Sequence, residues 1–109
     1  MKNKDIIILN ALKNQLTSEL NSEIDKIILF GSRAYGRAKK NSDYDLLLIL
    51  NIDNYDWRYK TKIIDYIYDL ELENDVMFDV HIISNYELNY TLRGKQPIFT
   101  NAIERGIYI

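Results

Sequence analysis

Residues 24–50 read IDKIILFGSRAYGRAKKNSDYDLLLIL, and this stretch decides the fold. Its first apolar segment, 24–30, predicts a buried strand that ends abruptly at Gly31-Ser32. Its last segment, 46–50, is apolar without interruption, which is typical of a central strand covered on both faces. The polar residues 39–42 between the two strands are expected to form a turn.

The rest of the chain alternates between helical and strand patterns. Apolar residues recur at helical spacing over 5–21 and 55–73, which predicts two amphipathic helices. A third strand is expected over 76–83. The other expected elements are short helices at 33–36, 85–92 and 98–105, a loop at 93–97 and a terminal strand at 107–109. This order predicts an α/β (α+β) fold in which helices flank a small mixed β-sheet.

The composition is that of a small folded protein without cysteine. The 109 residues are 47% apolar and include only 4 Gly and 1 Pro, so one domain over residues 1–109 is expected. The lack of cysteine excludes disulfides and cysteine-based zinc sites, and a cytoplasmic location fits it. No apolar run approaches membrane-spanning length, so no membrane association is expected.

The charge distribution favours a nucleotide over a nucleic acid as a partner. The formal net charge is −2, whereas proteins that bind a nucleic-acid backbone stably usually have a basic excess. The one local basic cluster consists of Arg33, Arg37 and Lys39-Lys40. Arg33 is therefore a candidate nucleotide-binding residue, and the alternative is that it pairs with acids or is only solvated.

Gly31-Ser32 is a candidate phosphate-binding turn. A glycine at a strand end lets the backbone approach a phosphate closely, and a helix that starts there offers free N–H groups. The Ser32 hydroxyl can add one hydrogen bond. By itself the pair is weak evidence, because Gly-Ser is a common turn.

Asp43-Tyr44-Asp45 is a candidate metal site at the beginning of the second strand. Residues i and i+2 of a strand point to the same face, so the two carboxylates are expected side by side. Like charges so close repel each other unless a cation lies between them, and oxygen ligands of this kind suit magnesium. The alternative is a polar start to the strand, with Asp43 capping a turn.

Asp79 is the third candidate ligand, because a carboxylate within an apolar strand is costly to bury without a partner. If this strand neighbours the second one, three carboxylates converge as in two-metal phosphoryl-transfer sites. The alternative is an Asp at a strand edge that faces solvent. His81, the only histidine, shares the face of Asp79 by strand alternation, where a hydrogen-bonded structural role is expected.

Gly31-Ser32, ten intervening residues and Asp43-Tyr44-Asp45 together resemble the signature of the DNA polymerase β-like nucleotidyltransferase superfamily. The fuller strings FGSRAYGRA (30–38) and SDYDL (42–46) are similar to the minimal nucleotidyltransferases, the antitoxins of HEPN/MNT toxin–antitoxin pairs. The resemblance implies a palm-like fold. It also implies that Gly31 and Ser32 hold the triphosphate, that Asp43 and Asp45 bind two magnesium ions, and that Asp79 is the third ligand and helps to deprotonate the attacking hydroxyl.

The function that the resemblance implies is protein adenylylation. The enzyme would transfer AMP from ATP to a tyrosine of a partner HEPN ribonuclease toxin and silence it. One alternative is an antitoxin that neutralises its toxin mainly by binding. Another is a small-molecule nucleotidyltransferase of the aminoglycoside type, which usually needs an added substrate-binding domain.

Overall fold

The central sheet has four strands in the order β3-β2-β1-β4, seen in a computed structural model that describes residues 2–109. Met1, the first residue of the domain expected over 1–109, lies outside the described residues. The strands are β1 (Ile24–Phe30), β2 (Tyr44–Leu50), β3 (Phe78–Ser84) and β4 (Ile107–Tyr108). β1 pairs antiparallel with β2 and β4, whereas β2 pairs parallel with β3. The expected small mixed sheet is confirmed.

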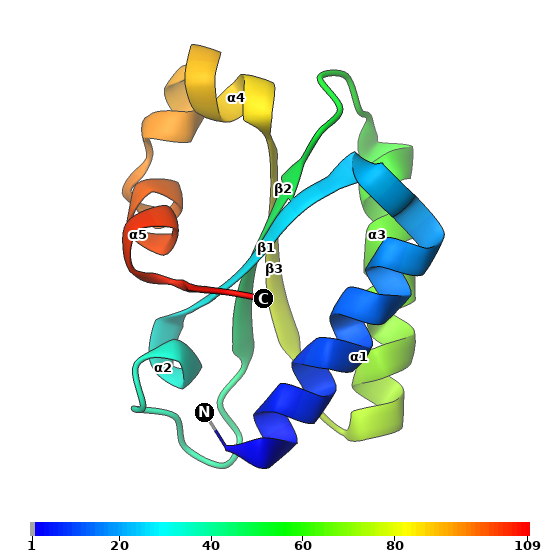
Figure 1. Ribbon diagram of the computed structural model, residues 1–109, viewed down its shortest axis with the longest axis vertical. Coiled ribbons are helices and arrows are strands. Elements are labelled where there is room, and N and C mark those ends of the chain that lie inside the picture. Colours follow the sequence, from blue (N-terminus) through cyan, green and yellow to red (C-terminus); the bar gives the residue numbers. More distant parts are fainter. Residues whose placement is uncertain (1) are drawn as a thin grey trace.

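Helices cover the two faces of the sheet unequally. The long helices α1 (Asn3–Leu20) and α3 (Trp57–Asn74) lie side by side on one face, as Figure 1 shows. The other face is crossed by α5 (Pro97–Arg105). Three short helical segments connect these elements: α2 (Gly31–Ala34), α4 (Asn85–Tyr90) and the 3-10 turn η2 (Leu92–Lys95). A further 3-10 turn, η1 (Asn21–Glu23), leads from α1 into β1.

The expected elements are present with boundaries shifted by one to two residues, and two connecting segments differ more clearly. The short helix expected over 33–36 begins at Gly31 and ends at Ala34, because Gly36 has a φ of 72° and cannot continue a right-handed helix. The expected loop at 93–97 contains η2, and α5 begins with Pro97 at its first position, where a missing N–H costs nothing.

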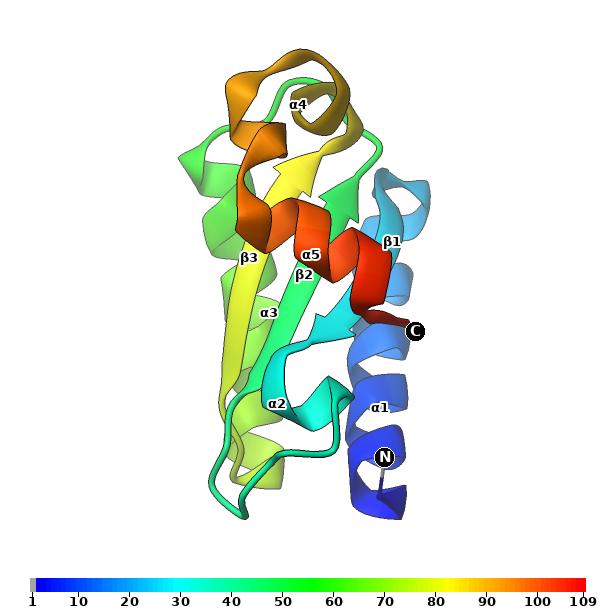
Figure 2. The same cartoon turned by 90° about the vertical axis from the view of Figure 1, so that its left-hand side faces the viewer.

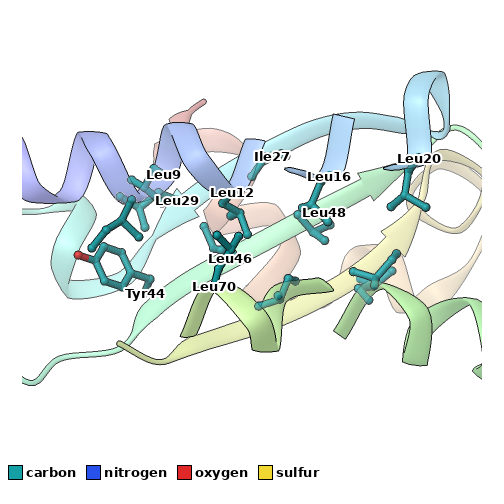
Figure 3. Packing of buried hydrophobic residues seen from close by; sticks show 14 of the residues in the cluster. Leu9, Leu12, Leu16, Leu20, Ile27, Leu29, Tyr44, Leu46, Leu48 and Leu70 are labelled. Carbon is teal, nitrogen blue, oxygen red and sulfur yellow. The ribbon is translucent and has the colours of Figure 1, made fainter. Parts of the chain in front are cut away.

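β2 is buried from both sides, as its uninterrupted apolar sequence predicts. Leu46, Leu48 and Leu50 pack in one cluster with the leucines of α1. Figure 3 shows Leu46 and Leu48 beside Leu12 and Leu16 of α1. Leu47 and Ile49 point the other way and pack with residues of α5, including Phe99 and Ala102. Strand alternation thus divides one apolar run between two cores.

α4 is attached to the end of β3 by a cluster of polar side chains around Glu87. Ser84 and Glu87 form a capping box at the start of α4. The Glu87 carboxylate also accepts hydrogen bonds from the Tyr55 hydroxyl and, at 2.8 Å, from Arg93 Nη1. Arg93 in turn donates to the carbonyl oxygen of Ile82 at 2.8 Å. Burial raises the pKa of Glu87, but the hydrogen bonds from Tyr55, Ser84 and Arg93 outweigh it and lower that pKa below its ordinary value of 4.5.

No helix within residues 2–109 is long and apolar enough to cross a membrane.

We expect Glu87→Gln to lower the free energy of unfolding by about 1–2 kcal/mol at neutral pH, because charge-assisted hydrogen bonds are weakened. Because the pKa of Glu87 is lower in the folded protein than its ordinary value of 4.5, the ionised side chain stabilises the fold at pH values above 4.5. This stabilisation is lost as the pH falls through the pKa of the folded state. The difference between wild type and variant should therefore shrink in acid. Urea unfolding at a series of pH values from about 7 to about 3 measures it.

The matched control is Glu104→Gln, at an exposed position of α5, which should change stability little at any pH. A Glu87→Gln effect that stays the same from neutral pH to acid would contradict the role assigned to the Glu87 charge.

Candidate active site

Asp45 and Asp79 lie opposite each other on neighbouring parallel strands. The register of β2 and β3 pairs these two residues directly, and it pairs Leu47 with His81 two positions further along. All four side chains belong to the sheet face that α5 crosses. In Figure 2, α5 lies across the upper parts of β2 and β3, and the short helix α2 lies beside the end where β2 begins. The prediction that the third strand neighbours the second is confirmed, and it places the two carboxylates side by side near the beginning of both strands.

The electrostatic surroundings of Asp45 disfavour its charged form. Burial, followed by the negative charges of Asp79 and Asp43, raises the pKa of Asp45. His81 acts in the opposite direction, and a hydrogen bond with Asp79 adds to the rise. A cation placed against this pair would relieve the repulsion, which makes it a suitable site for a metal ion.

Gly31 touches the Asp45 carboxylate, and this contact joins the two halves of the sequence motif. Phe30, the last residue of β1, is the register partner of Asp45, so the chain turns at Gly31 directly beside that side chain. A Cβ atom on Gly31 would overlap Asp45 Oδ2, and Gly31 also has a φ of 72°, where side chains are strained. Glycine is therefore required here both for backbone conformation and for space.

Ser32 follows in α2, where its side chain is half-buried. Its carbonyl oxygen accepts a hydrogen bond of 2.9 Å from the N–H of Arg37. This bond, with that from the N–H of Tyr35 to the carbonyl oxygen of Gly31, closes the turn after β1. The Ser32 hydroxyl thus lies one residue from the Gly31–Asp45 contact, but its role in holding phosphate stays a prediction.

Asp43 lies immediately before β2, at the end of the connecting loop. β2 begins at Tyr44, so strand alternation does not extend to Asp43, which is exposed at the end of the loop. Within residues 2–109, no three His, Cys, Asp or Glu side chains are arranged to hold one metal ion. The structure thus brings together Asp45 and Asp79, with Asp43 close enough to raise the Asp45 pKa. Magnesium usually binds through one or two carboxylates plus waters and substrate phosphates, so the donor chemistry of this pair fits it.

His81 extends the cluster along β3. Its Nε2 atom lies 3.5 Å from Asp79 Oδ2, and its ring lies 5.8 Å from that of Phe30, centroid to centroid. The expectation that His81 shares the face of Asp79 is confirmed. Its contacts with Asp79 and Phe30 hold the imidazole on the sheet beside the carboxylate pair.

Arg33 does not lie where a nucleotide-binding role would place it. Its guanidinium forms an ion pair with Asp5 at 3.2 Å and donates to the carbonyl oxygen of Ser42 at 2.7 and 2.9 Å. It also stacks over the ring of Tyr44, 4.1 Å from the centroid. Tyr44 and Asp45 are consecutive strand residues and point to opposite faces, so Arg33 lies on the α1 side of the sheet. The structure supports the alternative, that Arg33 pairs with an acid.

Asp5 is the residue that the sequence analysis missed. It is a buried carboxylate in the first turn of α1, and it accepts hydrogen bonds from the Tyr44 hydroxyl at 2.5 Å and from Arg33. Burial and the hydrogen bond to Asp5 raise the pKa of Tyr44 to about 12. A signal was available, because Asp5 precedes the buried residues Ile8, Leu9 and Leu12 at helical spacing and so lies on the apolar face of α1. Through Arg33, Asp5 anchors the loop that leads to Asp43.

Comparisons with known proteins agree with this architecture. A model of the nucleotidyltransferase domain family matches residues 9–108. No curated protein matches the sequence.

Among solved structures, a chain of a mutant form of the toxin-antitoxin MntA-HpeT is 20% identical, with a TM-score of 0.57 over 93% of this chain and 70% of its own. A chain of a toxin-antitoxin with AMP-PNP is also 20% identical, with a TM-score of 0.57 over 98% of this chain and 72% of its own. A chain of a second MntA-HpeT mutant is 19% identical, with a TM-score of 0.56 over 98% of this chain and 72% of its own. At these identities the likeness concerns the fold.

The family match is the more specific finding, because it is made on the sequence itself. Its residues, 9–108, run from α1 to β4 and include the turn at Gly31 and the carboxylates of β2 and β3. Since the match extends over nearly the whole chain, the protein belongs to the nucleotidyltransferase domain family.

Proposed function

We propose that this protein is a magnesium-dependent nucleotidyltransferase that transfers AMP from ATP to a hydroxyl group. The observation that carries the proposal is the pairing of Asp45 with Asp79 against the Gly31 turn. Two adjacent carboxylates offer oxygen ligands to a divalent cation, and a glycine turn beside them leaves room for a triphosphate. The AMP-PNP described with one of the structural neighbours is an ATP analogue, which supports ATP as the nucleotide.

The chemistry divides between the turn and the carboxylates. Gly31 and Ser32 would hold the triphosphate, and Asp43, Asp45 and Asp79 would hold the two magnesium ions, whose positive charge would offset the negative charge of the phosphates. The acceptor oxygen attacks the α-phosphorus in line, the bond to the bridging oxygen breaks, and pyrophosphate leaves. Asp79, which is partly exposed, takes the proton of the attacking hydroxyl.

The acceptor that we propose is a tyrosine of a HEPN-type toxin, and the protein is its antitoxin. The motif resemblance given above and the fold shared with toxin-antitoxin proteins support this choice. AMP attached to a toxin tyrosine adds bulk and negative charge, which would block its ribonuclease site. ATP and ribonuclease targets are both cytoplasmic, and so is the location that we propose.

We expect Asp45→Asn and Asp79→Asn each to lower AMP transfer by roughly 10²-fold or more, because each removes a carboxylate from the site. The measurement is label transfer from ATP labelled at the α-phosphate to the candidate toxin in the presence of magnesium. Asp53→Asn, at an exposed position of the loop after β2, is the matched control and should transfer label like wild type. Asp45→Asn should unfold no more easily than wild type in urea, because it removes repulsion between like charges.

The same assay separates adenylylation from inhibition by binding alone. If the toxin is inhibited equally by wild type and by Asp45→Asn, and no label reaches it, the protein is an antitoxin that acts by contact. Label found on an aminoglycoside rather than on the protein would identify the small-molecule alternative.

The variant Gly31→Ala tests the contact between the Gly31 turn and the Asp45 carboxylate. The added methyl group would displace the Asp45 side chain, so we expect magnesium-dependent ATP binding to weaken at least about tenfold. Gly36→Ala is a matched control, because Gly36 has the same φ of 72° but open space where its Cβ would lie. Both variants should lose about 1–2 kcal/mol of stability from the left-handed backbone. Isothermal titration calorimetry with ATP measures binding. An equal loss of ATP affinity in the two variants would show that backbone strain, and not the contact with Asp45, causes the effect.

A further inference from the structure

Helix α3 carries a stripe of apolar side chains that nothing in the described chain covers. Trp57, Ile64, Tyr68 and Leu72 are each more than half exposed. Successive helix residues are about 100° apart, so these four and Thr61 fall within an arc of about 80°. The buried residues Ile63, Ile67 and Leu70 lie on a separate arc that faces the sheet. Contiguous exposed apolar surface of this kind is typical of a protein interface.

A row of exposed charges borders this stripe along one side, and its sign changes halfway along the helix. Arg58 and Lys62 are basic and come first, whereas Asp65, Asp69 and Glu73 are acidic and come after. By the same helical spacing, the five lie within an adjoining arc of about 80°. Arg58 has only a long, exposed ion pair of 3.9 Å with Asp56, and within residues 2–109 the other four make no ion pair. The row is therefore available to a partner.

The order of these charges is unfavourable for α3 by itself. A helix is stabilised by acidic residues near its beginning and basic residues near its end, and α3 has neither in its first and last turns. Only the Asp56 side chain, which caps the first turn, acts in the favourable direction. The charge order thus gains nothing within one chain, but it would be favourable beside an antiparallel copy of the same helix.

We infer that α3 is a homodimer interface, in which the α3 helices of two copies pack antiparallel about a two-fold axis. In such an interface each patch meets its own copy, so the apolar stripes face each other. An antiparallel arrangement also brings the same flank of both helices together, with Arg58 and Lys62 of one copy facing Asp65 and Asp69 of the other. A parallel arrangement about a two-fold axis would place the two charge rows on opposite sides of the interface, where they could not pair. Charge complementarity therefore selects a second copy in one orientation.

The proposed dimer leaves the active-site face free. α3 lies on the face of the sheet opposite to Asp45 and Asp79, so a second copy would not cover the carboxylates. Dimerisation and nucleotide binding are thus separable, and neither result depends on the other.

Sedimentation equilibrium of the whole chain at about 1–100 μM tests the proposal. We expect dimers for wild type. Ile64→Lys should raise the dissociation constant of the dimer at least about tenfold, because it places a charge in the apolar stripe. Ile7→Lys is the matched control, because Ile7 is even more exposed than Ile64 but lies on α1, and it should leave the dimer unchanged. A wild-type chain that stays monomeric at about 100 μM would overturn the proposal. The apolar stripe would then be assigned to contact with a different protein.

Charge exchange tests the orientation even if single variants change stability. Arg58→Glu/Lys62→Glu makes the row wholly acidic, and Asp65→Lys/Asp69→Lys makes it basic except for Glu73, so each variant alone should be monomeric. Mixed in equal amounts, they should form a heterodimer, because both halves of the interface are then complementary. Both variants should bind ATP like wild type. Dimers of either variant alone, or no association on mixing, would overturn the antiparallel assignment.

The cysteine-free sequence permits a second test of the orientation. Ile64 lies near the centre of the proposed interface, so Ile64→Cys should form a disulfide-linked dimer on mild oxidation. Leu72 is eight residues further along, about 12 Å from the axis and about 24 Å from its copy, so Leu72→Cys should not. Cross-linking of both variants would show parallel or unspecific association and would contradict the proposal.

Discussion

The burial of β2 from both faces is the constraint on which the rest of the structure depends. Leucines of α1 cover one side of this strand and α5 covers the other, so almost every side chain of β2 is committed to a core. Asp45 is the exception, because it lies at the beginning of the strand, outside the part that α5 crosses. The packing that holds β2 in place thus also fixes the position of the Asp45 carboxylate, to which we assign a metal-binding role.

The candidate site contains carboxylates that repel each other and a backbone turn in close contact with one of them, and the surrounding strands hold these groups in place. Asp45 is partly buried beside two other carboxylates, and Gly31 lies so near that any side chain there would displace the Asp45 carboxylate. Such an arrangement costs stability unless a ligand compensates it, and it is held by the pairing of β2 with β1 and β3. On the opposite face, the Asp5–Arg33–Tyr44 cluster fastens the connecting loop to α1. Arg33, the basic residue in the motif, therefore supports the loop on the face of the sheet opposite to the carboxylate pair.

Much of this could be predicted from sequence because its cause is local. The spacing of apolar residues gave α1, α3 and the three long strands, and the glycine and aspartate positions gave the site residues with the correct secondary structure around them. The errors have local causes too. The turn at Gly36 ended α2 earlier than expected. β2 begins at Tyr44, one residue after Asp43, and the metal-binding role of Asp43 stays a prediction. The membership of the nucleotidyltransferase domain family agrees with the motif.

The sequence by itself determined the faces of each strand and helix, because side-chain direction follows from the repeat of the backbone. It could not determine which strand lies beside which, or at what register, because pairing depends on contacts between distant residues. Only the tertiary structure placed Asp79 opposite Asp45 and Gly31 against the Asp45 carboxylate. The same holds for Arg33, whose partner Asp5 is 28 residues away in the chain and lies beside it only because α1 packs on β2. Local periodicity therefore identified the groups of the site, and long-range packing decided which of them meet.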